Sequence, residues 1–134
     1  MKYKIKSFSG KTVEVEPRVE LYDVKDEILG KDMLGLAICL DEEFEDMDAQ
    51  YAVLTVSFGT FIGVKNAAYI DVNNCPFAYQ LLDYGFATDT GLTKNSGFCT
   101  YPLWVFDEEF LKKHGSENYS RYSRAYDDYM RSFE

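Results

Sequence analysis

Apolar and polar residues alternate along the first part of the chain, which is the period-2 pattern of half-buried β-strands. Residues 2–8 and 12–16 alternate on either side of Ser9-Gly10, a turn signal, and so predict a β-hairpin in which lysines lie opposite glutamates. Pro17 interrupts the alternation, and residues 19–21 are expected to continue it as an edge strand.

Two further alternating runs, 33–40 and 51–58, predict another pair of strands after a polar loop at 23–31. The segment between them, 41–48, holds six acidic residues in eight positions. The apolar residues of this segment also fit one or two helical turns, but the flanking strands favour a long acidic hairpin loop.

The second half of the chain is expected to mix short strands with helices. Residues 68–72 predict a strand, and Pro76 suits the first position of a short helix. A polar loop is predicted at 88–97. It is followed by an aromatic strand at 98–106, in which Pro102 indicates an edge position or a bulge.

Two helices are predicted at the C-terminal end. Asp107 is expected to cap the first, Gly115 to end it and Ser116 to cap the second, which carries a stripe of tyrosines over residues 119–133. Strands followed by helices predict an α+β fold, with a mostly antiparallel sheet, a short middle helix and two C-terminal helices in a single domain, residues 1–134.

The composition indicates a folded acidic protein. The 134 residues are 46% apolar and 16% aromatic, enough for a core that needs no disulfide or metal. The net charge of −9 is concentrated, because residues 12–48 carry 13 acidic and three basic residues whereas residues 1–11 carry four lysines and no acid. An acidic surface repels nucleic-acid backbones, so direct binding of DNA or RNA is not expected.

The cysteines and the hydropathy indicate a location. The three cysteines form no Cys-x-x-Cys pair, and Cys39 and Cys99 lie in apolar runs typical of buried thiols. The sequence has neither the pattern of a signal peptide nor an apolar run that could cross a membrane. We therefore expect a cytoplasmic protein with reduced cysteines and no contact with membranes.

The sequence offers little for catalysis or metal binding. His114, the one histidine, lies in a lysine-rich helix end, and no Cys or His spacing resembles a zinc site. The acidic run lacks the spacing and the glycine of a calcium loop. The 88–97 segment does not have the residue order of a phosphate-binding loop. We expect no catalytic residues, no metal and no cofactor.

One candidate site combines the Asn-rich turn with the 88–97 segment. Asp71, Asn73, Asn74 and Tyr101 could line a pocket for a small ligand or a nucleotide, beside a loop of a length that often has a function. The alternative is that the Asx side chains hydrogen-bond their own backbone and cap the next helix.

The acidic run is the other candidate site. It consists of Asp41, Glu42, Glu43, Glu45, Asp46 and Asp48. These carboxylates could belong to a solvated loop that keeps the protein soluble and protects a sheet edge. Alternatively, they could imitate the phosphates of a duplex and occupy a basic nucleic-acid channel. Their clustering favours the second interpretation.

Two segments resemble motifs of a known family: Ala-Tyr-Ile-Asp-Val-Asn-Asn at 68–74 and Ser-Gly-Phe-Cys-Thr-Tyr-Pro at 96–102. The family is an uncharacterised domain of unknown function in small acidic proteins, and the resemblance extends over most of the chain from about Met33. Its members are carried on plasmids, conjugative elements and phages of Gram-positive bacteria. Small acidic proteins on such elements often inhibit host defences, and the resemblance implies this context without assigning catalytic residues.

Three hypotheses follow from these patterns. The first is a non-enzymatic inhibitor or modulator of a host nucleic-acid-handling complex, in which the acids of 41–48 contact a basic protein or nucleoprotein. The second is a small-ligand or nucleotide-binding protein, or a weak enzyme, with its site near Asp71–Asn74. The third is a homo-oligomer that uses the tyrosine stripe of 119–133.

Overall fold

The structure is a computed structural model that describes residues 1–7 and 9–134. The end of the first predicted strand, at Phe8, lies outside the described residues. In the described part of the chain, eight strands form two antiparallel sheets of four strands each. The first sheet has the order β1-β2-β3-β4, with the bounds Tyr3–Lys6, Thr12–Lys25, Asp32–Phe44 and Met47–Val53. The second has the order β5-β6-β8-β7, with the bounds Thr55–Val56, Ala67–Ile70, Cys99–Phe106 and Ala87–Ser96.

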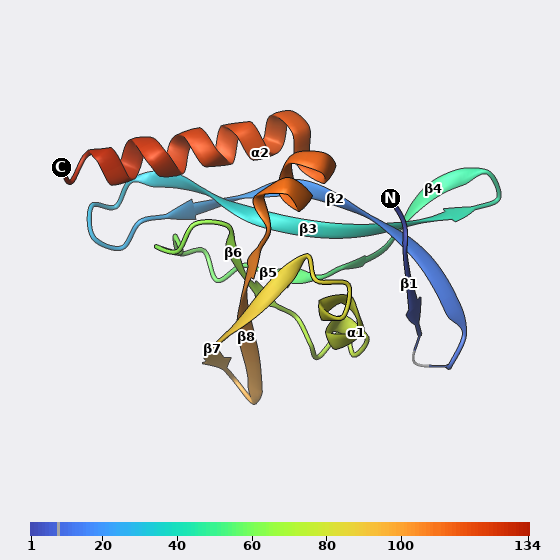
Figure 1. Ribbon diagram of the computed structural model, residues 1–134. Helices are drawn as coiled ribbons and strands as arrows, with labels where there is room; N and C mark the ends of the chain where they lie inside the picture. The colour runs from blue at the N-terminus through green and yellow to red at the C-terminus, as the bar shows by residue number, and fades with distance from the viewer. Residues whose placement is uncertain (8) are drawn as a thin grey trace.

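The two helices, α1 (Ala78–Leu82) and α2 (Glu108–Arg131), lie on opposite sides of the first sheet. Figure 1 shows α2 running along the long strands β2 and β3, with the second sheet and α1 on the other side. The inner part of β3 is covered on both faces, and each residue from Leu36 to Leu40 is 6% exposed or less. The predicted α+β fold with antiparallel sheets and a short helix after Pro76 is confirmed.

The predicted N-terminal hairpin is confirmed, with Tyr3 opposite Val15 and an ion pair of 4.0 Å between Lys4 and Glu14. The predicted interruption at Pro17 is wrong, because β2 continues through Pro17 to Lys25. From Glu16 onward β2 pairs with β3, while β1 extends only as far as Val15. Pro17 lies just beyond the last pair of β1 and β2, so its missing N–H does not break the hydrogen-bond ladder between these two strands.

The polar loop predicted at 88–97 is also wrong, because most of this segment is the strand β7, paired with β8. Its side chains are polar and mostly exposed, so the segment lacks the alternation by which strands are recognised. The pairing is irregular between Asp89 and Thr93, and Pro102 lies opposite Thr93 beside this irregularity. Pro102 is therefore at a bulge, as predicted, although β8 is a central strand.

The two predicted C-terminal helices are two segments of α2. Asp107 is the N-cap residue, and the helical backbone breaks at Ser116, whose φ is 45° and ψ is −117°. Gly115 lies against β2 at this break, and a Cβ atom there would lie 3.0 Å from the Val19 Cβ atom. No helix in residues 1–7 and 9–134 combines the length and the apolar content needed to cross a membrane.

The tyrosine stripe of α2 is part of the core. Tyr119, Tyr122, Tyr126 and Tyr129 are each 8% exposed or less. The hydroxyl of Tyr119 donates to Asn66 Oδ1 at 2.9 Å, and the hydroxyls of Tyr122 and Tyr126 also bond to the 63–66 segment. These tyrosines are therefore unavailable as an oligomerisation surface, and the third hypothesis is wrong on this point.

Candidate functional site

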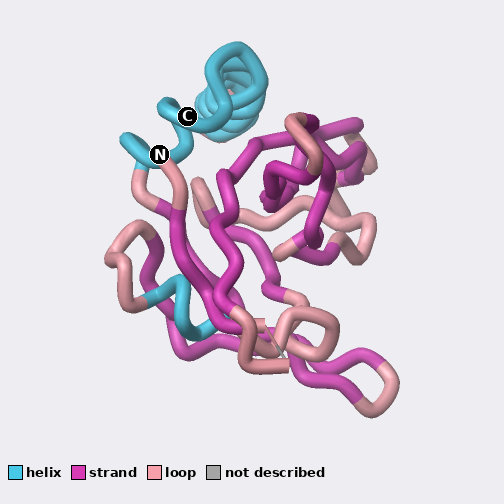
Figure 2. The backbone as a smooth tube through the Cα atoms, turned by 90° about the vertical axis from the view of Figure 1, so that its right-hand side faces the viewer, coloured by secondary structure: helices cyan, strands magenta, loops and turns pink. Residues whose placement is uncertain are grey.

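The outer parts of β3 and β4, residues 41–50, form a hairpin that projects from the body of the protein (Figures 1 and 2). We call it the arm. The predicted long acidic loop is corrected, because both strands continue to a turn of only two residues, Glu45 and Asp46. Their φ angles of 51° and 63° are those of a type I′ turn. Both faces of the arm are solvated at its end, so its sequence does not alternate like that of a half-buried strand.

The arm has two different faces. Residues directly opposite each other in an antiparallel pair share a face, and successive residues point to opposite faces. Glu43 lies opposite Asp48, and Phe44 lies opposite Met47. The acid face thus carries Asp41, Glu43 and Asp48, and the apolar face carries Glu42, Phe44 and Met47.

Basic residues anchor the inner end of the acid face. The Arg18 guanidinium donates to both carboxylate oxygens of Asp41, from Nε at 2.9 Å and from Nη2 at 3.3 Å. These bonds, with one to Glu20, raise the pKa of Arg18. Lys2 Nζ lies 3.5 Å from Glu43 Oε2. Among the described residues, the other four acids of the arm have no ion-pair partner: Glu42, Glu45, Asp46 and Asp48.

A groove of about 290 Å³ runs beside the acid face. It is lined by Asp41, Glu43 and Asp48 from the arm and by Lys113 and His114 from α2, among others. Burial, the N-terminal ammonium and Lys113 lower the pKa of His114, which favours the neutral imidazole. Within the part of the chain that the structure describes, no three His, Cys, Asp or Glu side chains gather as a metal site requires. The groove has both acidic and basic side chains in its lining. The acids without an ion-pair partner among the described residues lie mainly nearer the turn of the arm.

Two large apolar side chains lie exposed on the other face. Phe44 is 63% exposed and Met47 is 71% exposed, and they flank the turn. Exposed aromatic and methionine side chains are typical anchors in protein interfaces. The sequence contained this signal, but the predicted long acidic loop gave Phe44 and Met47 no defined face.

In the other candidate site, Asp71 and Asn74 form the local hydrogen bonds of the alternative interpretation. Asp71 Oδ2 accepts a hydrogen bond from Asn74 Nδ2 at 2.8 Å, and Asp71 Oδ1 accepts one from the Asn74 backbone N–H at 3.3 Å. The Asp71 carboxylate therefore stabilises the turn before α1 by bonding to Asn74. Asn73 belongs to the same turn, and Tyr101 of β8 lies near its side chain, with its ring 5.3 Å from that of Phe58.

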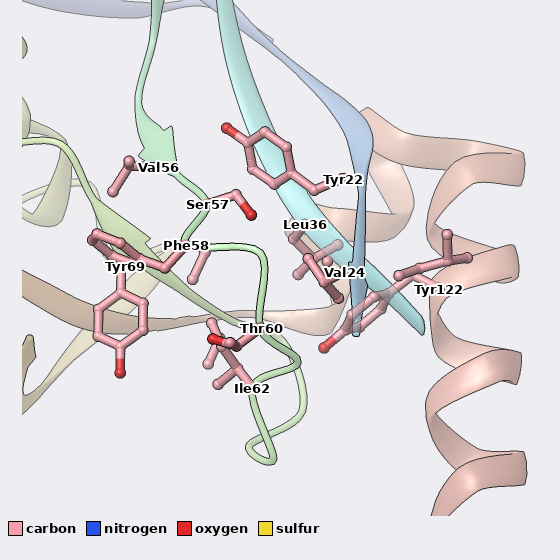
Figure 3. A pocket seen from close by; sticks show the side chains of 14 residues that line it. Tyr22, Val24, Leu36, Val56, Ser57, Phe58, Thr60, Ile62, Tyr69 and Tyr122 are labelled. Carbon is pink, nitrogen blue, oxygen red and sulfur yellow. The ribbon is translucent and has the colours of Figure 1, made fainter. Parts of the chain in front are cut away.

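A cavity between the two sheets does not include the four residues of that candidate site. Figure 3 shows it lined by Tyr22 and Val24 of β2, by Phe58 and by Tyr122 of α2, among others. Its volume is about 20 Å³, which is room for about one water molecule. The structure therefore brings the six predicted acids of 41–48 together on one projecting element, but it builds no pocket from Asp71, Asn73, Asn74 and Tyr101 at this cavity.

Comparison with known proteins places the chain in a family. A family model described as a domain of unknown function, DUF4313, matches residues 22–126. The chain belongs to the DUF4313 family. The DUF4313 match contains the arm and both segments, 68–74 and 96–102, on which the resemblance to an uncharacterised family was based. Arg18 and Lys2, which hold the inner end of the arm, lie before the DUF4313 match. Neither the curated proteins nor the solved structures that were searched contain a match to the chain.

Proposed function

We propose that this DUF4313 protein is a non-enzymatic protein-binding module whose arm contacts a basic protein or nucleoprotein complex. One observation carries the proposal: six acids lie on a projecting two-stranded hairpin, and four of them have no ion-pair partner among the described residues. Surface carboxylates held in this way are accessible to a cationic partner from several directions. They would also accelerate its association, because a concentrated charge steers an oppositely charged surface.

The spacing of the acids supports imitation of a nucleic acid. A strand rises about 3.3 Å per residue, so the arm from Asp41 to its turn spans about 13 Å. Four unpaired carboxylates over that length correspond to roughly one charge per 3 Å, close to the phosphate spacing along one strand of a duplex. A basic channel that binds nucleic acid would meet a similar density of negative charge on the arm.

The finer proposal is a cytoplasmic inhibitor or modulator of a host nucleic-acid-handling complex, such as a defence complex, encoded on a mobile genetic element. Its support is the resemblance to small acidic proteins of plasmids, conjugative elements and phages, together with the acidic arm. The free cysteines, of which Cys39 and Cys75 are buried, fit a reducing compartment. The arm would bind the complex directly and would not bind nucleic acid itself.

The experiment is affinity capture from the native host with three forms of the protein. The first is the wild type. The second, the arm variant, replaces the six acids by their amides: Asp41→Asn, Glu42→Gln, Glu43→Gln, Glu45→Gln, Asp46→Asn and Asp48→Asn. The third, the matched variant, makes six equivalent changes at exposed acids elsewhere: Glu27→Gln, Asp32→Asn, Asp83→Asn, Glu109→Gln, Glu117→Gln and Glu134→Gln.

The arm variant and the matched variant have the same net charge and differ only in where the acids are removed. We expect the wild type and the matched variant to retain the same basic complex and the arm variant to lose it. Circular dichroism and thermal unfolding of all three forms serve as the control for folding. Retention of the complex by a folded arm variant would refute the proposal.

A further inference from the structure

The two edges of the first sheet are treated differently. At the β1 edge, two side chains from the α1 region bond to the outward backbone groups. Gln80 Oε1 accepts from the Lys6 N–H at 2.7 Å, and Gln80 Nε2 donates to the Lys6 carbonyl at 3.0 Å. The Tyr84 hydroxyl accepts from the Lys4 N–H at 3.0 Å and donates to the Lys4 carbonyl at 2.7 Å. These bonds take the place of a neighbouring strand, so the β1 edge cannot add one.

The β4 edge has no such cover. A two-residue turn pairs the residues on either side of it, Phe44 and Met47, through their backbones. Pairs then alternate, so the backbone N–H and C=O groups of Asp48 and Gln50 point away from β3. Among the described residues, no backbone group of residues 47–51 bonds to anything outside the β3–β4 pair. This edge lies on the projecting arm, where a further strand can approach it.

The edges of the second sheet are less suited to strand addition. β5 has two residues, and β7 is divided by its irregularity between Asp89 and Thr93. The exposed side chains of β7 include Asp89 but no cluster of one charge. A long, uninterrupted edge is a risk for aggregation that proteins reduce by bulges and short strands, and both devices are present here. On β4 the register shifts at the inner end of the arm, between Gln50 and Ala52, so residues 47–50 next to the turn form a regular edge.

We infer that the β4 edge binds an extended cationic segment of the partner as an additional β-strand. The occupant follows from charge complementarity on the arm. A second copy of this chain would bring two sets of acids together, with Asp48 near its own equivalent, and like charges at such a distance oppose pairing. A segment rich in lysine or arginine would instead neutralise the unpaired carboxylates while its backbone bonds to Asp48 and Gln50.

The two faces of the arm define the pattern of that segment. Side chains of an added strand alternate between the faces of the sheet. On one face they lie beside Asp48 and Gln50, with Glu43 on the next strand, and on the other beside Met47 and Ala49, with Phe44 on the next strand. The segment should therefore alternate basic residues with apolar residues. This inference rests on the proposed function and adds the conformation and the sequence pattern of the partner.

The test uses a synthetic ten-residue peptide in which lysine alternates with valine, titrated into the isotopically labelled protein and followed by NMR. A second peptide of the same composition has its lysines and valines in two blocks. We expect the alternating peptide to shift the amide signals of Asp48 and Gln50 first and to bind at least ten times more tightly than the block peptide. Shifts of these amides with protein concentration alone would show that a second copy covers the edge, which would overturn the inference.

N-methylation of the peptide removes backbone N–H groups without changing its charge, and so isolates the contribution of backbone hydrogen bonds to its affinity. An added strand directs every second N–H toward β4, so we prepare one peptide methylated at the lysines and one methylated at the valines. We expect one of the two to lose at least tenfold in affinity and the other to bind like the unmodified peptide. Equal affinities of both methylated peptides and the unmodified one would overturn strand addition.

The arm variant distinguishes failure of this inference from failure of the proposed function. Loss of binding by the arm variant, with equal binding of both methylated peptides to the wild type, would leave a charged contact without strand pairing. Equal binding of the alternating peptide to the arm variant and the wild type would contradict the proposed function itself. Gln50→Pro, which removes one outward N–H and no charge, should weaken the peptide about as much as the effective methylation does.

Discussion

β3 belongs to two hairpins, and their turns are attached to the rest of the molecule in different ways. The β2–β3 turn is fixed: the Asp26 carboxylate accepts from the backbone N–H groups of Ile28 at 3.1 Å and Leu29 at 2.7 Å, and it also bonds to Tyr129 of α2. The β3–β4 turn, Glu45-Asp46, has no hydrogen bond or ion pair to the body among the described residues. One strand thus joins a turn that is bonded to α2 through the buried Asp26 to a turn that has no such bond.

The inner part of β3 contributes to stability, whereas its outer part, in the arm, is free to take part in binding. From Leu36 to Leu40 every side chain of β3 is buried between α2 and the second sheet, whereas Phe44 is 63% exposed. Acids that contribute nothing to the core, on a segment that the core does not need, fit a role in binding.

Truncation of the inner part of β3 should destabilise the fold most. Leu40 is 0% exposed, so Leu40→Ala leaves a cavity and should lower the free energy of unfolding by about 2–5 kcal/mol. Phe44→Ala, four residues further along the same strand, should change it by less than about 0.5 kcal/mol. Urea unfolding followed by the fluorescence of Trp104, the one tryptophan, measures both. Similar losses in the two variants would contradict the division of β3.

Close packing between α2 and β2 should make Gly115 sensitive to a single methyl group. A Cβ atom at Gly115 would lie 3.0 Å from the Cβ atoms of both Val19 and Tyr119, so Gly115→Ala should destabilise the fold by about 1–3 kcal/mol. Gly63→Ala is the matched control, because no atom lies within 4 Å of the position of its Cβ. Thermal unfolding of the two variants checks this, and an unchanged melting temperature for Gly115→Ala would contradict the packing.

The fixed turn should make stability depend on pH. Burial alone would raise the pKa of Asp26, but hydrogen bonds from Tyr129 and from the Leu29 and Ile28 backbones outweigh it and lower the pKa. A lowered carboxylate pKa stabilises the fold above the unfolded value, about pH 4, and this contribution is lost as the pH falls through the folded value. The difference in unfolding free energy between the wild type and Asp26→Asn should thus be largest near neutral pH and shrink below about pH 4.

Asp46→Asn, in the other turn of β3, is the control for this pH dependence. The free turn gives its carboxylate no bond to the body among the described residues, so the difference in unfolding free energy between this variant and the wild type should not change with pH. Chemical unfolding at a series of pH values measures both variants. A constant difference for Asp26→Asn across the whole range would show that its carboxylate is not the group responsible.

The smallest effect is expected at the turn of the arm. Glu45 and Asp46 both have positive φ, a region that favours Asn and Gly over these residues. Glu45→Asn combined with Asp46→Gly should stabilise the arm locally by about 1 kcal/mol, which slows amide exchange there roughly fivefold. Exchange in the inner part of β3 should not change. Faster exchange in the arm of this variant would show that the native turn is not strained.

The sequence predicted the strands that have one buried face and the helix end that is marked by a glycine. The N-terminal hairpin alternates because one face is buried, and the break in α2 follows from Gly115 and Ser116. The strands of the arm and β7 were missed because their side chains face solvent on both sides, so no alternation marks them. The acids of the candidate site were identified from composition, whereas its apolar face, Phe44 and Met47, depends on pairing across a turn.

The salt dependence of binding by the captured partner tests the central claim most directly. The affinity of the purified partner for the wild type, the arm variant and the matched variant is measured over a series of salt concentrations. We predict that the wild type and the matched variant bind alike, with an affinity that falls steeply as salt rises, and that the arm variant binds weakly at every concentration. An arm variant with the affinity and the salt dependence of the wild type would contradict the claim that the arm is the contact surface.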